Sequence, residues 1–382
     1  MKMGLAPIRT IGACLIFGRR SLRAMKDVLL KDFRPQCLLR VASHVPDQAR
    51  FPVIDAHNHL FGDLPAEELI EVMDAVGVRV WVNVTGNTTL PLVNNTYSIA
   101  RRDIRTFMDQ YVQRYPGRFA ALTMADFAQW EDPVLIKDND FAKRCIEQLE
   151  ADVAAGARGL KVTKELGLLF RDHTGAMLRV DDERLAPIWQ RAGELGIPVL
   201  IHVSDPIAFF QPIDEHNEHY LTLQEFPGWS FHGSHFSKWE ILQQRNRMIA
   251  RHPETRFWLP HVANLPEDLA AVGELLDNHP NASIDFSARI DELGRQPYTA
   301  AEFFRRYADR ILFGLDMPVS AEAYRCYFRF LETRDEYFDY PDYIGRFGVY
   351  TRWKLYGLGL SDEVLKKVYY ENAMRLLGLT LA

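Results

Sequence analysis

The sequence predicts a (β/α)8 barrel, an α/β fold in which helices surround a closed ring of parallel strands. After residue 50, short apolar runs alternate with amphipathic segments, which is the order expected of repeated β-α units. Residue types that bind metals or substrates follow these runs, at the positions where such a barrel has its active site. An open doubly wound sheet is the alternative. No G-x-G-x-x-G motif follows a predicted strand, which counts against the nucleotide-binding form of that sheet.

The composition is that of an ordinary globular protein. Of the 382 residues, 47% are hydrophobic and 25% are charged, and the net charge is −6. No block of like charge indicates a nucleic-acid surface. The cysteines Cys14, Cys37, Cys145 and Cys326 form no C-x-x-C pair, which argues against a zinc knuckle and a disulfide framework. We therefore expect a cytoplasmic protein that acts on a small molecule and has no nucleic-acid or membrane partner.

The N-terminal segment contains an apolar run at 11–17, between basic residues. The run is short for a transmembrane helix, and its flanks are unsuited to a signal peptide. We expect residues 1–50 to form a loosely ordered leader and residues 51–382 to form the barrel domain. Export through an atypical leader is the alternative.

The elements of the barrel follow one another from residue 52. Glycines or polar residues separate them, as at Gly77, Gly117, Gly156 and Gly196. The eight predicted strands are 52–54, 78–84, 119–124, 158–162, 198–203, 256–260, 282–286 and 310–313. The predicted helices are 66–76, 95–115, 140–155, 182–195, 238–252, 265–278 and 299–307.

Two stretches exceed the minimal barrel. Residues 207–237, after the fifth strand, are rich in aromatic residues and histidine, and a loop of this length usually forms a lid or part of a functional site. Residues 320–382 form a predicted C-terminal helical extension. Its last helix begins at Ser361, a suitable N-cap, and Asp362 and Glu363 in its first turn complement the helix dipole.

The residues most indicative of function begin with His57 and His59 at the end of the first strand. In a strand, residues i and i+2 face the same side, so the two imidazoles would present two nitrogen ligands to one metal ion. Further polar residues stand on or just after the later strands. They are Lys161 on the fourth strand, His202 on the fifth, His261 on the sixth, Arg289 on the seventh and Asp316 on the eighth.

This pattern resembles the amidohydrolase superfamily over about residues 51–378. More closely, it resembles the amidohydrolase-related branch of TIM barrels that includes aminocarboxymuconate-semialdehyde decarboxylase and several aromatic-acid decarboxylases. The resemblance implies one divalent metal ion, zinc or manganese, with His57, His59, His202 and Asp316 as ligands. It also implies that His261 is an acid or base near the metal, and that the protein is a homodimer.

The reaction implied first is hydrolysis of an amide, lactone or ester bond in a small, carboxylated substrate. The metal would lower the pKa of its bound water toward about 7. Asp316 would take a proton from the attacking water, and His261 would polarise the substrate. The same ligands would serve a non-oxidative decarboxylase of an aromatic or unsaturated acid, which is the alternative. A catalytically silent barrel that binds a ligand is the third possibility.

Two cations have more than one interpretation. Lys161 would be a carbamylated bridge between two metals, a contact for a substrate carboxylate, or a barrel residue paired with an acid. Arg289 is the best candidate for a substrate carboxylate because its fork binds in a bidentate manner, with a structural salt bridge to Asp285, Asp291 or Glu292 as the alternative.

The insertion at 207–237 contains two histidine pairs at spacing i, i+3, His216 with His219 and His232 with His235. Its prolines and glycines make a regular helix improbable. We interpret these histidines as lid surface or substrate contacts, with a second metal site as the remaining alternative. Asp55 is expected to anchor the turn after the first strand rather than bind metal.

Overall fold

The computed structural model describes residues 27–29, 32, 36–93, 96–97, 99–127, 135–340 and 352–381. The chain divides into two units, 1–40 and 41–382, and the second contains the barrel. The apolar run at 11–17 lies outside the described residues. Within the described part of the chain, no helix has the length and apolar character needed to cross a membrane.

The predicted strands form a ring of parallel neighbours. They pair in the order β1-β2-β7 and β8-β10-β12-β13-β14-β15. Leu122 joins β7 to β8, and its N–H donates to Asn83 O while Thr123 N–H donates to Gly159 O, so the chain changes partners without leaving the ring. The ring closes through Ala56 N–H to Phe313 O, at 3.0 Å, and Asp316 N–H to His57 O, at 2.9 Å. The ring strands are β1 (Val53–Asn58), β2 (Val78–Asn83), β7 (Phe119–Ala121), β8 (Thr123–Met124), β10 (Leu160–Val162), β12 (Val199–Ile201), β13 (Phe257–Leu259), β14 (Ala282–Asp285) and β15 (Ile311–Leu312).

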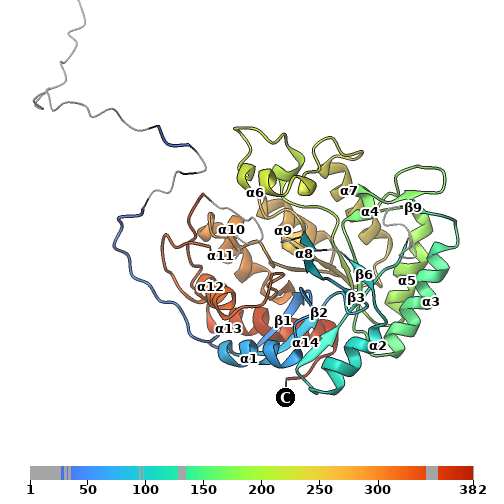
Figure 1. Cartoon of the computed structure of the whole chain (residues 1–382), viewed down its shortest axis with the longest axis horizontal. Helices are drawn as coiled ribbons and strands as arrows, with labels where there is room; N and C mark the ends of the chain where they lie inside the picture. The colour runs from blue at the N-terminus through green and yellow to red at the C-terminus, as the bar shows by residue number, and fades with distance from the viewer. Residues whose placement is uncertain are drawn as a thin grey trace, which may run out of the picture. The chain divides into compact units, whose positions relative to one another are not determined.

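Helices surround this ring (Figure 1). In α1, Leu69, Met73 and Val76 are buried, and the helix ends at Gly77, whose φ of 84° suits glycine. The main helices and single turns are α1 (Ala66–Val76), α2 (Ile104–Phe107), η2 (Met108–Gln113), α3 (Phe141–Ala154), α4 (Glu165–Leu168), η3 (Glu183–Leu185), α5 (Ala186–Glu194), α7 (Lys238–Arg251), α8 (Pro260–Ala263), α9 (Leu269–Asn278), α10 (Ile290–Leu293), α11 (Pro297–Arg306), η6 (Ala308–Arg310) and α12 (Ala321–Glu332).

Two predicted helices begin later than expected. The helix predicted over 95–115 is wrong for the described residues 96–97 and 99–103, because Asp103 caps α2 by accepting from Arg105 N–H. Short antiparallel pairs precede it, and the small strands outside the ring are β3 (Thr88–Thr89), β4 (Leu92–Val93), β5 (Thr96–Tyr97), β6 (Ala100–Arg101), β9 (Leu135–Ile136) and β11 (Arg171–Asp172). The helix predicted from 265 begins at Leu269, since the Asp268 side chain accepts from Ala271 N–H.

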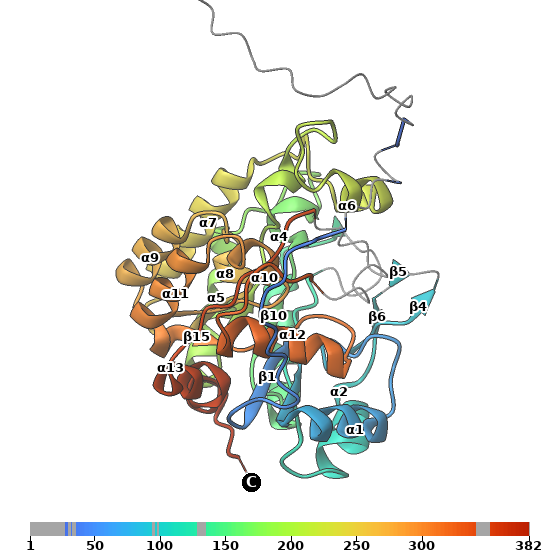
Figure 2. The same ribbon diagram turned by 90° about the vertical axis from the view of Figure 1, so that its left-hand side faces the viewer.

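The insertion and the C-terminus lie at opposite ends of the barrel (Figure 2). The insertion contains η4 (Ile207–Phe210), α6 (Tyr220–Glu225) and η5 (Pro227–Trp229). The C-terminal segment contains α13 (Asp362–Lys366), η8 (Lys367–Glu371) and α14 (Asn372–Leu377). Leu376 and Leu377 join the apolar cluster of inward-facing strand residues such as Trp258, so α14 packs against the interior of the ring. Ser361 occupies the N-cap position of α13, although its side chain makes no capping hydrogen bond.

The leader proposed over 1–50 includes ten residues that belong to the barrel unit. Ala49 N–H donates to Val76 O, and His44 Nδ1 lies 2.6 Å from Asp335 Oδ1.

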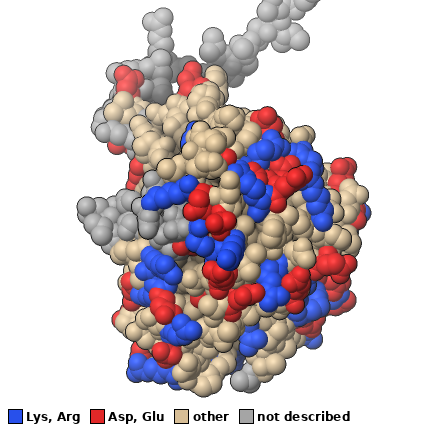
Figure 3. Space-filling view, turned by 90° about the vertical axis from the view of Figure 1, so that its right-hand side faces the viewer, with Lys and Arg blue, Asp and Glu red and all other residues tan. Residues whose placement is uncertain are grey.

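On the face drawn in Figure 3, basic and acidic side chains are interspersed. This pattern agrees with a sequence that has no block of like charge.

Candidate metal centre and its cavity

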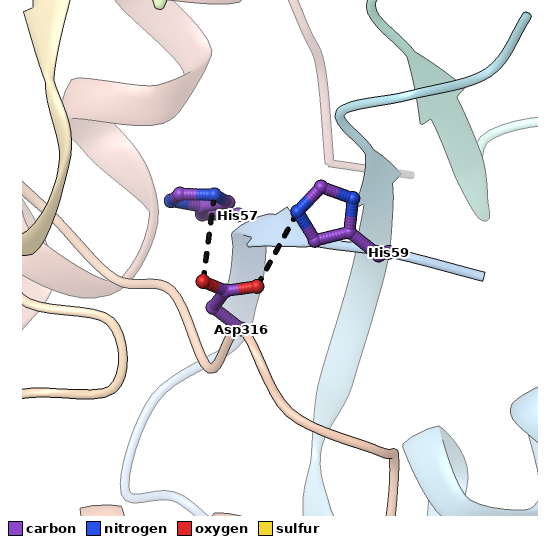
Figure 4. Close-up of side chains that lie close together, drawn as sticks. All are labelled: His57, His59 and Asp316. Carbon is purple, nitrogen blue, oxygen red and sulfur yellow. Dashed lines mark ion pairs between the residues drawn. The ribbon is translucent and has the colours of Figure 1, made fainter. Parts of the chain in front are cut away.

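Three of the predicted ligands converge at the carboxyl ends of the strands. His57 lies in β1, His59 directly follows it, and Asp316 follows β15. His59 Nε2 is 3.4 Å from Asp316 Oδ1, and His57 Nε2 is 3.9 Å from Asp316 Oδ2 (Figure 4). One donor atom from each residue lies within 4.8 Å of the others. The i, i+2 placement of the histidines and the closure of the ring beside β15 together create this site.

Hydrogen bonds orient both imidazoles. His57 Nδ1–H donates to Asp285 Oδ2 at 2.8 Å, which leaves the Nε2 lone pair facing Asp316. His59 Nδ1 is 2.9 Å from Thr85 Oγ1. Asp285 also accepts from Trp258 Nε1, at 2.8 Å, so it is a fixed acceptor. The sequence analysis treated Asp285 only as a partner for Arg289. Asp285 stands at the end of a predicted strand, among residues assigned to a metal, and this position is the sequence feature that could have indicated its role.

The ionisation states suit a metal. Burial lowers the pKa of His59 to about 3 against the opposing effect of Asp316. Burial opposes ionisation of Asp316, but the neighbouring His57 and His59 lower its pKa below the usual value. A neutral His59 imidazole and an ionised Asp316 carboxylate are donors of the kind that zinc and manganese bind, and His57 adds a second imidazole nitrogen. The residues present therefore fit a divalent ion.

Lys161 lies directly against this donor set. Its side chain is buried in β10, and Nζ is 3.3 Å from His57 Nε2, the atom that faces Asp316. Burial lowers the pKa of Lys161 to about 8, with Asp316 and Asp285 opposing this effect. The ammonium group and a metal ion would therefore compete for the same lone pair. From the sequence, one interpretation of Lys161 is a barrel residue paired with an acid. Its contact in the structure is with a histidine instead.

His261 and His202 face the site differently. His261 Nε2 is 3.5 Å from Asp316 Oδ2, and its Nδ1–H donates to Ser287 O at 2.8 Å. Burial holds the pKa of His261 well below its ordinary value. The His202 ring packs 4.6 Å from that of His261, but its Nε2–H donates to Ser204 O at 3.0 Å. The structure thus brings His261 to Asp316. The ligand role of His202 stays a prediction, and the residue would have to bind a metal through Nδ1 or after rotation of its ring.

The backbone at His261 is unusual. His261, Val262, Ala263 and Asn264 have φ between 52° and 59°, a left-handed turn that costs energy for L-residues other than glycine. Buried cations bind its carbonyl groups, since Lys238 Nζ donates to Asn264 O at 2.6 Å and Arg245 Nη1 donates to Ala263 O. These bonds hold the turn that directs His261 toward Asp316.

A cavity of about 230 Å³ adjoins the donor set. Apart from the candidate ligands, its wall includes Phe61, Leu90, Phe209, Trp229, Met317 and Tyr340. Arg289 also lines it, with Nη2 3.5 Å from Asp205 Oδ1. This partner is none of the three acids that the sequence analysis considered. Phe209 and Trp229 come from the insertion, which therefore covers part of the cavity.

His216 and His219 lie in different environments in the structure, whereas His232 and His235 are both exposed. The His216 side chain is 86% exposed, whereas that of His219 is 4% exposed and lies at the cavity wall. His219 instead lies beside Asp291 and Glu292, with one donor atom from each residue within 4.8 Å of the others. The sequence analysis did not connect these acids to His219 because they are distant along the chain.

Residues 44–379 match the model of a protein family described as Amidohydrolase. A putative amidohydrolase from Staphylococcus aureus is 16% identical, with a TM-score of 0.52 over 86% of this chain and 100% of that one. A 2,6-dihydroxybenzoate decarboxylase, solved in complex with 2,6-dihydroxybenzoate, is 17% identical, with a TM-score of 0.51 over 86% and 100%. These likenesses show the shared barrel fold. No curated protein sequence matches the chain.

Proposed function

The chain belongs to the amidohydrolase family, and on this premise we propose that it is a metal-dependent decarboxylase of a small aromatic acid. The observation that carries the proposal is the pair of cations, the buried Lys161 and the mostly buried Arg289, on the cavity wall beside the metal donors. This assignment reverses the order of the two reactions expected from the sequence. A similar barrel serves a 2,6-dihydroxybenzoate decarboxylase, which suggests hydroxylated benzoates as the substrates to test first.

We assign the metal to His57, His59 and Asp316, with His202 as a possible fourth ligand. A divalent ion held there would polarise a substrate oxygen as a Lewis acid. Asp285 and Thr85 fix the two imidazoles, so this chain orients its ligands before the ion arrives.

Lys161 and Arg289 are assigned to the negative charges of the substrate. Arg289 is 12% exposed, and no hydrogen-bond partner is found for its Nε among the described residues. A guanidinium group held in this way suits the planar geometry of a carboxylate. The apolar wall removes water from the carboxylate, which favours loss of neutral CO2 over retention of a buried anion.

His261 is assigned to proton transfer. When the C–C bond breaks, its electron pair remains on the ring carbon, CO2 leaves, and the carbon takes a proton. His261 Nδ1–H is held by Ser287 O, so Nε2 is the atom that exchanges a proton. Burial keeps this imidazole neutral in the free protein, and an anionic substrate would raise its pKa. The proton would therefore be taken up together with the substrate.

Hydrolysis is the second candidate, and the neutral state of His261 favours it. A neutral imidazole 3.5 Å from Asp316 is a suitable acceptor for a proton from an attacking water. The two reactions differ in the product that they form from a carboxylated substrate.

A homodimer stays a proposal that the molecular mass in solution would test.

The test uses metal-loaded protein in D2O with a panel of hydroxybenzoates and a panel of aromatic lactones. Decarboxylation would release CO2 and leave one deuterium on the vacated ring carbon, which proton NMR detects. His261→Asn should reduce the rate at least 100-fold without loss of bound metal. Lactone opening with no decarboxylation would overturn the proposal in favour of hydrolysis. Ligand binding with no turnover in either panel would favour the silent barrel.

A further inference from the structure

A second group of potential ligands lies in the wall of the same cavity. His219 immediately precedes α6 in the insertion, and Asp291 and Glu292 lie in α10, which follows β14. All three are at least nine-tenths buried, with exposures of 4%, 3% and 2%. His219 Nε2 is 3.7 Å from Glu292 Oε1, and one donor atom from each residue lies within 4.8 Å of the others.

These side chains have unsatisfied polar atoms. Among the described residues, no hydrogen-bond partner is found for His219 Nε2, Asp291 Oδ1 or either carboxylate oxygen of Glu292. A buried carboxylate without a partner is costly, and most buried polar atoms in native proteins are satisfied. The local arrangement therefore lacks a positive charge.

The two nearby arginines, Arg289 and Arg295, do not neutralise these carboxylates, because both are engaged elsewhere. Arg289 Nη2 already lies 3.5 Å from Asp205 Oδ1, and its Nη1 donates to Ala288 O. Arg295 donates to Glu218 Oε2 at 2.7 Å and stacks on the Trp353 ring at 3.9 Å.

The geometry points to a second divalent-cation site formed by His219 Nε2, Asp291 Oδ1 and Glu292 Oε1. Ligands at about 2.0 Å around a tetrahedral zinc ion lie roughly 3.3 Å apart, and the observed 3.7 Å requires only a small contraction. The comparable separations at the first site are 3.4 and 3.9 Å. One imidazole and two carboxylates suit zinc or manganese. This site is separate from a second metal bridged by Lys161.

The imidazole of this site is held in place before an ion binds. The His219 ring makes edge contacts with Phe209, at 5.4 Å, and Trp353, at 5.5 Å. Its backbone N–H donates to Asn217 Oδ1 at 2.9 Å, and Asn217 Nδ2 donates to Ala208 O at 2.8 Å. A bound ion would connect the insertion to the loop after β14 and hold the insertion over the cavity.

The experiment counts metal ions on the full chain. Protein stripped with chelator is dialysed against micromolar zinc chloride or, separately, manganese chloride, and metal per chain is measured by elemental analysis. Wild type should bind two ions per chain. Glu292→Gln and Asp316→Asn should each bind one, and the double variant should bind none. Glu218→Gln is the matched control, since it removes a neighbouring carboxylate that pairs with Arg295, and it should still bind two.

A structural readout accompanies the count. Saturating zinc should protect the insertion from limited proteolysis in wild type and Asp316→Asn but not in Glu292→Gln. Circular dichroism checks folding, and His219→Gln replaces Glu292→Gln if the latter unfolds. One ion per chain in wild type, or an unchanged count in both Glu292→Gln and His219→Gln, would overturn the second site. Neither measurement uses activity, so the proposed decarboxylation can fail while this site stands.

Discussion

Lys161→Met tests the electrostatic description of the centre in the metal-free protein. Lys161 is 2% exposed, and its pKa is lowered from 10.5 to about 8 mainly by burial. At about 1.4 kcal/mol for each pH unit, this lowering corresponds to about 3 kcal/mol that the charged lysine costs the folded state. Between pH 8 and 10.5 the unfolded chain retains a proton that the folded protein has released. The stability of wild type relative to Lys161→Met should therefore rise with pH across this window and stay constant below it.

The assay is thermal unfolding of both chelator-treated proteins from pH 6.5 to 10.5. With an unfolding entropy of about 2.1 cal/mol/K per residue, 3 kcal/mol corresponds to roughly 4 °C in the difference between the two unfolding temperatures. Taking the difference removes titrations common to both proteins. Lys143→Met, at a side chain that is 77% exposed, should show no such trend. A difference for Lys161→Met that stays constant over the whole range would refute the reasoning, since Lys161 would then titrate normally.

Three further substitutions test the support of the site. Asp285→Asn replaces the carboxylate that fixes His57 with a neutral amide, which is a weaker acceptor, and should weaken metal binding about 10- to 100-fold in a chelator competition; unchanged affinity would contradict this role. Gly314→Ala would place a Cβ 2.7 Å from His57 Cβ, so bound metal should fall together with a stability loss of about 1–3 kcal/mol; full metal content at wild-type stability would argue against this close approach. Asp55→Ala should lower the unfolding free energy by about 2–4 kcal/mol in urea, because Tyr324 OH and two other donors lose their acceptor, whereas Tyr324→Phe should cost only about 1 kcal/mol; equal effects would contradict this explanation.

Asp55 illustrates how far sequence reasoning extends. From the sequence, Asp55 is expected to anchor the turn after the first strand rather than to bind metal. The structure gives it an anchoring role over a longer range, since it accepts from Leu315 N–H and from Tyr324 OH. Both partners come from the C-terminal part of the chain, so Asp55 secures the closure of the ring. A local pattern indicates that an acid is structural, but its partners depend on which strands become neighbours.

The insertion shows the same limit at the cavity. From the sequence, His216 and His219 are both interpreted as lid surface or substrate contacts, yet one is exposed and the other is buried against Asp291 and Glu292. The helix predicted from residue 95 failed for a related reason. Its polar and apolar residues fit a helix, while pairing of β3 with β6 holds part of that stretch extended.

Local sequence patterns predict the alternation of strands and helices and the placement of His57 and His59 on one side of β1, because side-chain periodicity is a local property of the backbone. They also predict that candidate ligands stand at the carboxyl ends of the strands. The folded structure was needed to show that Lys161 contacts His57, that Asp285 orients it, and that His219 meets Asp291 and Glu292. These contacts join residues far apart in the chain, so they depend on which strands and loops become neighbours, which no local pattern records.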